Sequence, residues 1–544
     1  MSLSRAETLC LLAALALSLL AALAVALPPV TFDTLHLADT TFLAEAARWI
    51  HGGAVPGRDF DYFYGGIHAQ FVAWAYGLTG VTIKALDIAL LLEWAVLMGL
   101  LAALAWRRLD GFATAGLLLL LSVIVFARLP FEEYPQLLRF DAAHSFGYNR
   151  LGTALVVLGA VAVLVPGRTA TAETLGAGIA GVTAMLALLT KWTFAPHLLA
   201  CALGFALMGR WRGLLVYLIA AGLTLLAVDP GLHRLSGAYA YSMANAGVGE
   251  GVVWILRKSL RMMLAQQVQV LAALGILILC LIRGNRTLIR PALAAVLILG
   301  GFWGTAVTMG PGGLVGHQGT PVIAGLAILL AFAADRAGAG ARAPMAALAA
   351  LLLAAVAVPQ GLNTLGTAAL SFRHAEKVAF HDGAYAGYLA RDGHLRDEAG
   401  GIVTLAQDPQ SAVAVAAAQL SAGLSGGQGG TINVDYVRLW DGLRLVGPLP
   451  EAATTTLVSD SLIHFGFALG TARPENYPIW PRIRAPEFAP GSDPLAGVDL
   501  VLLSTHDGEG LHGILRAAMG SDFTPCRRSP LWELHARPGH CPAG

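Results

Sequence analysis

The sequence has few charged residues for its length. It contains 35 Lys and Arg and 34 Asp and Glu, 69 charges in 544 residues, whereas a soluble protein of this length has about a quarter of its residues charged, roughly 136. This shortage excludes an ordinary water-soluble enzyme, and the net charge of +1 gives no basic excess for binding nucleic acid. Hydrophobic residues make up 56% of the chain, which indicates a multi-span membrane protein.

Apolar runs long enough to cross a bilayer recur along the first two thirds of the chain. Because a membrane helix needs about 20 apolar residues, we expect eleven transmembrane helices. They lie near residues 9–27, 84–106, 111–128, 150–166, 174–190, 193–209, 212–229, 263–282, 288–309, 318–334 and 344–360. Two alternatives stay open: the runs on either side of Lys191 can form one kinked span, and the first run also fits a cleavable signal peptide.

Arginine in the short loops predicts which way the chain threads through the membrane. Alternate loops are basic, and basic loops stay on the cytoplasmic side. These loops carry Arg5, Arg107, Arg108, Arg168, Arg210, Arg212, Arg283, Arg286, Arg290, Arg336 and Arg342. The N-terminus is then cytoplasmic, and loops 28–83, 129–149, 230–262 and 310–317 lie outside, as does the C-terminal segment. Residues 67–80 are apolar but too short for a span, so we expect an interfacial helix there.

The composition changes near residue 371, where charge, Gly and Pro return. We therefore divide the chain into a membrane domain, 1–370, and an extracytoplasmic domain, 371–544. Segments 401–409 and 498–506 are typical of buried strands, each followed by a helix, and 526–538 is typical of a strand pair. The predicted fold is an α-helical multi-span membrane protein with a C-terminal α/β domain.

Cysteine is scarce, with five residues in the chain. Cys10, Cys201 and Cys280 fall in spans, where a thiol behaves as a small apolar side chain. Cys526 and Cys541 lie close together in the outer domain, so a disulfide and two free thiols are both open. No CxxC or Cys/His cluster suggests a zinc site.

The first outer loop, 28–83, is the most informative part of the sequence. Thr40 or Asp39 can cap a helix that runs to about Ile50 and ends at Gly52 and Gly53. A carboxylate held at the membrane surface can take a proton from an acceptor hydroxyl during group transfer; the alternative is that Asp39 only caps the helix. Asp59 and Asp61 form an Asp-x-Asp pair that can share a divalent cation such as Mg or Mn.

Three sequence segments support a family resemblance. The run ADTTFLAEAARWIHGG (38–53), then GRDFDYFYGG (57–66) and an apolar half-helix ending LTG, resembles the first periplasmic loop of bacterial integral-membrane glycosyltransferases of the GT-C fold. The segment LLTKWTF (188–194) resembles their Lys-containing stretch. Thr40 replaces a frequent second acid, and Gly65 and Gly66 replace prolines common in relatives.

The resemblance implies an enzyme that moves a sugar from a polyprenyl-phosphate carrier to a lipid, polysaccharide or protein acceptor at the outer face of the inner membrane. Such enzymes usually invert the anomeric centre. In such enzymes the acidic residue of the first loop is the proposed base, which corresponds to Asp39, and a second carboxylate corresponds to Asp59. No cofactor is required by this chemistry, and a divalent cation remains an option.

A carrier phosphate needs cationic or hydrogen-bonding partners as the leaving group gains charge. Our candidates for the donor phosphate are Lys191, Arg150, Arg257, Lys258 and Arg58. Our candidates for substrate binding are His68, His144, Tyr148 and His317. Lys191 is the sharpest, because a Lys between apolar spans is costly, although it can also reach the headgroups. The basic group at 257–261 can equally contact phospholipid headgroups.

Two other function classes remain open. A transporter or flippase places polar residues at mid-span in two related halves, but here Asp87 and Glu93 are the main mid-span charges, and no internal repeat is evident. A noncatalytic assembly protein, whose outer domain binds partners, would keep the same architecture.

Overall fold

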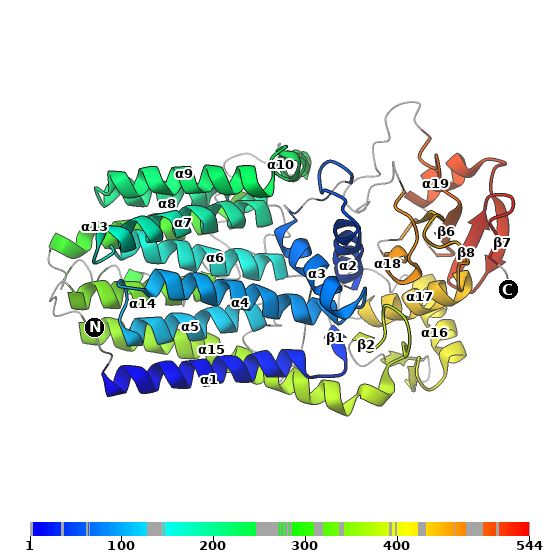
Figure 1. Ribbon diagram of the computed structural model, residues 1–544. Coiled ribbons are helices and arrows are strands. Elements are labelled where there is room, and N and C mark those ends of the chain that lie inside the picture. Colours follow the sequence, from blue (N-terminus) through cyan, green and yellow to red (C-terminus); the bar gives the residue numbers. More distant parts are fainter. Residues whose placement is uncertain are drawn as a thin grey trace.

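The structure is a computed structural model. It describes residues 4–33, 37–60, 62, 64, 66–127, 144, 147–245, 271, 274–275, 278, 282, 286–308, 319–336, 342–390, 394–397, 400–422, 431–461, 463–474, 493–506 and 511–542. Figure 1 shows a long helical bundle, a C-terminal domain at one end of it, and the first loop between the two. The N-terminus lies at the end of the bundle away from the C-terminal domain.

The bundle has helices at ten of the eleven predicted spans within the described residues. They are α1 (Arg5–Ala26), α4 (Ala85–Ala105), α5 (Gly111–Phe126), α6 (Gly147–Leu164), α7 (Ala170–Thr190), α8 (Ala195–Leu207), α9 (Trp211–Val228), α13 (Arg286–Thr308), α14 (Gly319–Arg336) and α15 (Arg342–Arg373). Six of the described helices are long and apolar enough to cross a membrane, and others are shorter and apolar. The predicted span near 263–282 lies mostly outside the described residues.

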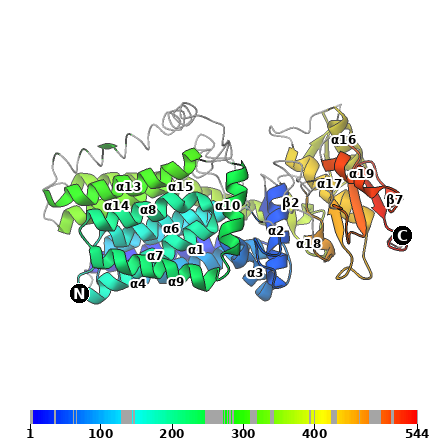
Figure 2. The same cartoon turned by 90° about the horizontal axis from the view of Figure 1, so that it is seen from above.

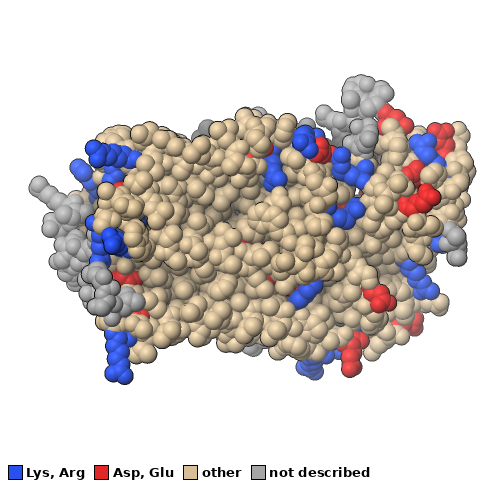
Figure 3. Space-filling view, in the orientation of Figure 1, with Lys and Arg blue, Asp and Glu red and all other residues tan. Residues whose placement is uncertain are grey.

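Buried and exposed residues are distributed in the bundle as they are in a membrane protein. All residues of α6 are buried, so this helix forms the centre. By contrast α9 exposes Leu215, Leu218 and Leu223, which suits a helix whose outer face meets lipid. A broad uncharged belt runs along the bundle in Figure 3. The helical membrane fold predicted from the apolar runs is therefore confirmed.

Two arginines of the basic loops also bind backbone carbonyls near helix ends. The buried side chain of Arg108 donates to the carbonyls of Val165 and, at 2.7 Å, of Ala172. Arg210 donates to the carbonyls of Ala162 and Val163, each at 2.7 Å. These carbonyls include those at the end of α6, which have no partner within the helix. Lys and Arg gather at this end of the bundle in Figure 3.

The first outer loop folds into β1 (Thr31–Asp33), α2 (Leu37–His51) and α3 (Ile67–Thr79). The expected cap at Asp39 or Thr40 is wrong, because α2 already begins at Leu37 and Asp39 lies in its first turn. The helix does end as predicted before Gly53, which has a φ of +94° that favours glycine. In Figure 2, α2 and α10 (His233–Asn245) lie across the end of the bundle.

Helix α15 runs past the predicted end of the last span at residue 360 and ends at Arg373. The sequence suggested an earlier end because polar residues begin there, but several of these are buried and bonded. Ser371 Oγ donates to the Val30 carbonyl at 2.7 Å and accepts from its N–H at 3.0 Å. Thr364 Oγ1 donates to the Phe126 carbonyl at 3.2 Å. The helix thereby joins the bundle to the first loop.

The C-terminal domain is mixed α and β, as the composition predicted. Its helices are α16 (Pro409–Ser421), α17 (Thr431–Val446), α18 (Gly466–Leu469) and α19 (Leu511–Met519). Its strands are β2 (Tyr388–Ala390), β3 (His394–Arg396), β4 (Ile402–Thr404), β5 (Leu457–Ser459), β6 (Leu500–Ser504), β7 (Thr524–Arg528) and β8 (Trp532–Ala536). The main sheet has the order β5-β6-β8-β7, with β5 and β6 parallel and the others antiparallel.

Two of the three strand predictions agree with this sheet. Segment 498–506 contains β6, followed by α19, and the tail forms the β7–β8 hairpin. The expectation of a buried strand at 401–409 is wrong in one respect: β4 is present but pairs with β3 in a separate hairpin, and Ile402 is 55% exposed. Helix α16 follows the strand as predicted and packs against this hairpin, where Leu395 is buried, whereas Ile402 lies outside that contact.

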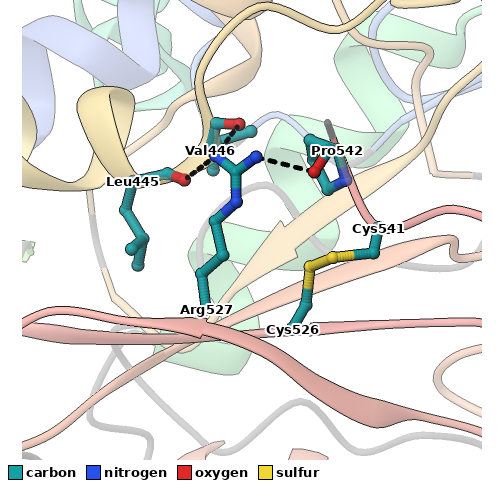
Figure 4. Close-up of a disulfide and its surroundings, with 6 residues drawn as sticks. All are labelled: Leu445, Val446, Cys526, Arg527, Cys541 and Pro542. Carbon is teal, nitrogen blue, oxygen red and sulfur yellow. Dashed lines mark hydrogen bonds between the residues drawn. A yellow bond between two sulfur atoms is a disulfide. The ribbon is translucent and has the colours of Figure 1, made fainter. Parts of the chain in front are cut away.

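Cys526 and Cys541 form a disulfide, with Cα atoms 5.8 Å apart. Figure 4 shows it beside Arg527, whose guanidinium donates to the carbonyls of Leu445 at 3.0 Å and Pro542 at 2.6 Å. The covalent bond and the arginine together attach the tail to β7 and to the end of α17.

Candidate functional site

A lysine and two tyrosines meet at the end of the bundle that faces the C-terminal domain. The rings of Tyr64 and Tyr148 are stacked with centroids 3.7 Å apart, and their hydroxyls are 2.7 Å apart. Lys191 Nζ lies 4.8 Å from the Tyr148 ring centroid and 5.6 Å from that of Tyr64. It also donates to Asn149 Oδ1 at 3.3 Å. The buried ammonium is thus held by two aromatic faces and an amide oxygen.

Three separate elements bring these side chains together. Tyr148 and Asn149 lie in the first turn of α6, and Tyr64 precedes α3 in the first loop. Lys191 lies where the chain leaves α7 in an extended conformation before the short 3-10 turn η2 (Trp192–Phe194). The structure therefore has two helices at this point and not one kinked span.

Asp39 lies within electrostatic range of this cluster. Burial holds the pKa of Tyr64 well above its usual value, and the neighbouring Tyr148 and the charge of Asp39 raise it further. The Tyr64 hydroxyl consequently stays protonated and can act as a hydrogen-bond donor. Asp39 itself is partly exposed in the first turn of α2, where the helix dipole favours a negative charge.

A row of aromatic rings leads from α2 towards the cluster. Trp49 meets Phe60 with centroids 5.1 Å apart, Phe60 meets Tyr62 at 6.1 Å, and Tyr62 meets Tyr64 at 5.7 Å. The alternating pattern of residues 60, 62 and 64 is visible in the sequence, but nothing in it singled out Tyr64. Tyr64 is therefore a site residue that sequence reasoning misses.

Asp33 is a second functional candidate that the sequence did not reveal. Its carboxylate is fully buried. Oδ2 accepts a hydrogen bond from the Thr40 hydroxyl and another from the Tyr388 hydroxyl at 3.4 Å. Thr40 follows Asp39 in α2, and Tyr388 comes from β2, which pairs with β1 in parallel. Asp33 thus ties the start of α2 to the C-terminal domain.

Arg58 and Asp59, neighbours in the first loop, form an ion pair with each other. Arg58 donates to Asp59 at 2.7 and 2.9 Å, and the Val55 N–H donates to the same carboxylate at 2.7 Å. The hydrogen bond from Arg58 is the main reason why the pKa of Asp59 is lowered to about 2. The structure therefore uses the two side chains to close a turn, and their predicted roles remain predictions.

Three other predicted residues have partners within the protein. His68 Nδ1 and Glu93 Oε1 are 2.6 Å apart, with both side chains buried. His144 Nε2 lies 3.7 Å from Asp87 Oδ1. The buried Arg150 donates to the carbonyl of Ala127 at the end of α5. Glu93 and Asp87, the two carboxylates that the sequence places at mid-span, thus each interact with a histidine.

Asp87 has further partners near the first loop. Lys84 Nζ and the Thr31 hydroxyl each donate to its Oδ2 at 3.0 Å. This carboxylate therefore links β1 to the start of α4.

The remaining predicted residues are outside the described part of the chain. They are Asp61, Arg257, Lys258 and His317. Within the described residues no three His, Cys, Asp or Glu side chains are grouped as a metal site would require. The divalent site at Asp59 and Asp61 accordingly stays a prediction.

Comparison with known proteins gives a likeness of fold. In fold, the chain is similar to ArnT. A crystal structure of ArnT from Cupriavidus metallidurans bound to undecaprenyl phosphate matches with a TM-score of 0.48 and 13% identity, over 98% of this chain and 99% of that one. The apo form of ArnT from the same organism matches with a TM-score of 0.45 and 16% identity, over 98% of each chain. No family model and no curated protein matches the sequence.

Proposed function

We propose that this protein is a membrane glycosyltransferase that moves a sugar from a polyprenyl-phosphate carrier to an acceptor hydroxyl. One observation supports this above the others: at one end of the bundle the buried ammonium of Lys191 lies against the Tyr64–Tyr148 pair, and Asp39 is near enough for its charge to raise the pKa of Tyr64. Transfer from a lipid phosphate needs a base for the acceptor and a cation for the leaving group. The class of donor comes from the resemblance of the first loop to GT-C enzymes.

The proposed reaction is a single displacement at the anomeric carbon. Asp39 accepts the proton of the acceptor hydroxyl while the acceptor oxygen bonds to the anomeric carbon. The bond from that carbon to the carrier phosphate breaks, and polyprenyl phosphate leaves with the electron pair. Lys191 stabilises the charge that grows on the leaving phosphate, and the Tyr64 and Tyr148 hydroxyls supply hydrogen bonds. The product has the inverted configuration.

The site belongs on the outer face of the inner membrane in this proposal, with the N-terminus in the cytoplasm. Two features support that placement. Lys and Arg gather at the opposite end of the bundle, as expected for a cytoplasmic side (Figure 3). The C-terminal domain contains the disulfide Cys526–Cys541, which is typical of an oxidising compartment.

The test is sugar transfer in membranes that contain polyprenyl-phosphate sugars. We expect Asp39→Asn to lower the rate at least about 100-fold, because general bases contribute about 10²- to 10⁴-fold. Asp522→Asn is the matched control, since Asp522 is an exposed carboxylate of the C-terminal domain and is paired with Arg537. Full activity in Asp39→Asn would exclude this base, and solute flux without any glycan change would favour a transporter.

A further inference from the structure

A cavity in the C-terminal domain takes no part in the chemical step proposed above. It measures about 520 Å³, within the range of about 300–1,000 Å³ that is usual for small-molecule sites. We call it the α17 pocket. Its main lining residues are Phe380, Asp382, Tyr385, Trp440, Arg444 and Leu469.

The floor of the pocket is aromatic. Phe380 and Tyr385 are buried, with ring centroids 5.6 Å apart. The turn between them contains Gly383, whose φ of +77° lets the chain reverse sharply and expose Asp382. Helix α17 provides one wall and α18 another.

The rim combines an aromatic ring with two opposite charges. Trp440 is half-buried, and the guanidinium of Arg444 lies 5.2 Å from its ring centroid. Arg444 and Asp382 are both exposed. The pocket therefore offers an apolar surface, a hydrogen-bond donor and a hydrogen-bond acceptor side by side.

We propose that the α17 pocket binds a neutral saccharide unit. A sugar ring has an apolar C–H face that can lie against Trp440, and each hydroxyl can accept from Arg444 or donate to Asp382. A lipid tail would match the aromatic floor but would use neither of the two exposed charged groups on the rim. A phosphate would meet the repulsion of Asp382 beside a single cation, and a nucleotide would meet the same obstacle.

The pocket is built on elements that also position the candidate active site. The Ala384 carbonyl in its lining accepts from the N–H of Ile83, before α4, at 2.7 Å. Phe467, beside the lining residue Ala468, stacks on Tyr76 of α3 with centroids 6.0 Å apart. The Tyr76 hydroxyl donates to the Ala44 carbonyl of α2 at 3.0 Å. A saccharide bound in the pocket thus lies on the same side of the bundle as Asp39.

The pocket adds an acceptor-binding site to the proposed function. Only the assignment of the saccharide to the acceptor rests on that function. The acceptor would then be a glycan or a glycolipid, held by a sugar unit away from the reacting hydroxyl. Binding to the pocket itself can be measured without transfer.

The experiment measures binding of the full-length protein in detergent to an array of immobilised neutral hexose and N-acetylhexosamine oligosaccharides. We expect wild type to bind at least one group of these glycans. Trp440→Ala should weaken this binding about tenfold or more, and Arg444→Met and Asp382→Asn, both at exposed positions, about three- to fivefold each. Arg528→Met is the matched control, because Arg528 is exposed in the same domain and is not among the pocket residues.

The outcomes separate the pocket from the transfer reaction. If no neutral glycan binds wild type, or if all three pocket variants bind as wild type does, the saccharide proposal is wrong. Loss of co-purified phospholipid from the pocket variants, with glycan binding unchanged, would also overturn it in favour of a lipid. Asp39→Asn should bind glycans normally, and Trp440→Ala should raise the acceptor KM. Glycan binding without any transfer activity would overturn the proposed function and leave the pocket assignment standing.

Discussion

Asp33 and Asp39 are carboxylates of the same loop with different surroundings. Asp33 is fully buried and accepts hydrogen bonds from Thr40 and Tyr388. Asp39 is partly exposed and near enough to the tyrosine pair for its charge to raise the pKa of Tyr64. A base must reach its substrate, whereas a buried carboxylate with local donors holds its neighbours in place. We therefore assign Asp33 as a positioning residue for the first turn of α2.

We expect Asp33→Asn to lower kcat for transfer about tenfold, with the acceptor KM little changed. The amide oxygen can still accept hydrogen bonds, but the loss of charge weakens them and alters the geometry at Thr40, and small displacements reduce rates strongly. Steady-state kinetics and the pH profile are the measurements. A role in folding alone would change the amount of folded enzyme and leave its kcat unchanged. Asp110→Asn, at the helix cap of α5 at the other end of the bundle, is the control.

Single residues were predictable where their chemistry conflicts with their surroundings. Lys191 was found this way, because an ammonium between apolar runs is costly, and the structure places it in the cluster. Tyr64 was missed because a tyrosine beside other aromatic residues is unremarkable in a sequence. Asp33 was missed because only the pairing of β1 with β2 buries it.

Helix α2 connects the candidate site to the C-terminal domain. The His464 N–H donates to Thr41 Oγ1 at 3.2 Å, and the His464 ring lies 5.8 Å from that of Phe42. Arg48 donates to the Thr471 carbonyl at 2.7 Å while also binding Glu45. These contacts lie along the helix that carries Asp39, so the C-terminal domain fixes its orientation.

The contact at His464 should weaken in acid. Burial lowers the pKa of His464 to about 4, so between pH 6.5 and 4 the unfolded state binds the proton and the folded state does not. Stability is then complete above about pH 6.5 and falls as the pH drops towards 4. We expect a loss of about 1 kcal/mol at pH 5, allowing for partial exposure of the side chain.

Thermal melts of the detergent-solubilised protein between pH 7.5 and 4.5 measure this effect. His464→Gln should flatten the decline in Tm with falling pH, whereas His540→Gln, at a histidine near the chain end, should not. An identical pH dependence in wild type and His464→Gln would mean that other groups cause the decline.

The positions of helices were predicted well where apolar composition decides them. The residues at which helices begin and end were predicted less well. The apolar runs located the spans because lipid requires a continuous apolar helix. The start of α2 at Leu37 and the extension of α15 to Arg373 were missed. Polar residues such as Ser371 normally end a span, and here their hydrogen bonds to the first loop allow the helix to continue.

The distribution of charge over the whole molecule gives a test of topology. An alkaline phosphatase fused after Gly544 should be active, because this enzyme folds only outside the cytoplasm. The same reporter fused in the basic loop at Arg210 should be inactive. We expect the opposite pattern from a cytoplasmic green fluorescent protein at the two positions. An inactive C-terminal fusion would mean that the C-terminal domain, and the site beside it, lie in the cytoplasm.

The sequence alone determined that this protein belongs in a membrane and where most of its described helices lie, since these depend on local composition and on the cost of polar groups in lipid. Only the tertiary structure decided which polar residues meet. Tyr64, Tyr148 and Lys191 are far apart in the chain and come together through helix packing. The same packing pairs His68 of α3 with Glu93 of α4. Such partners depend on contacts between distant segments, which local patterns do not encode.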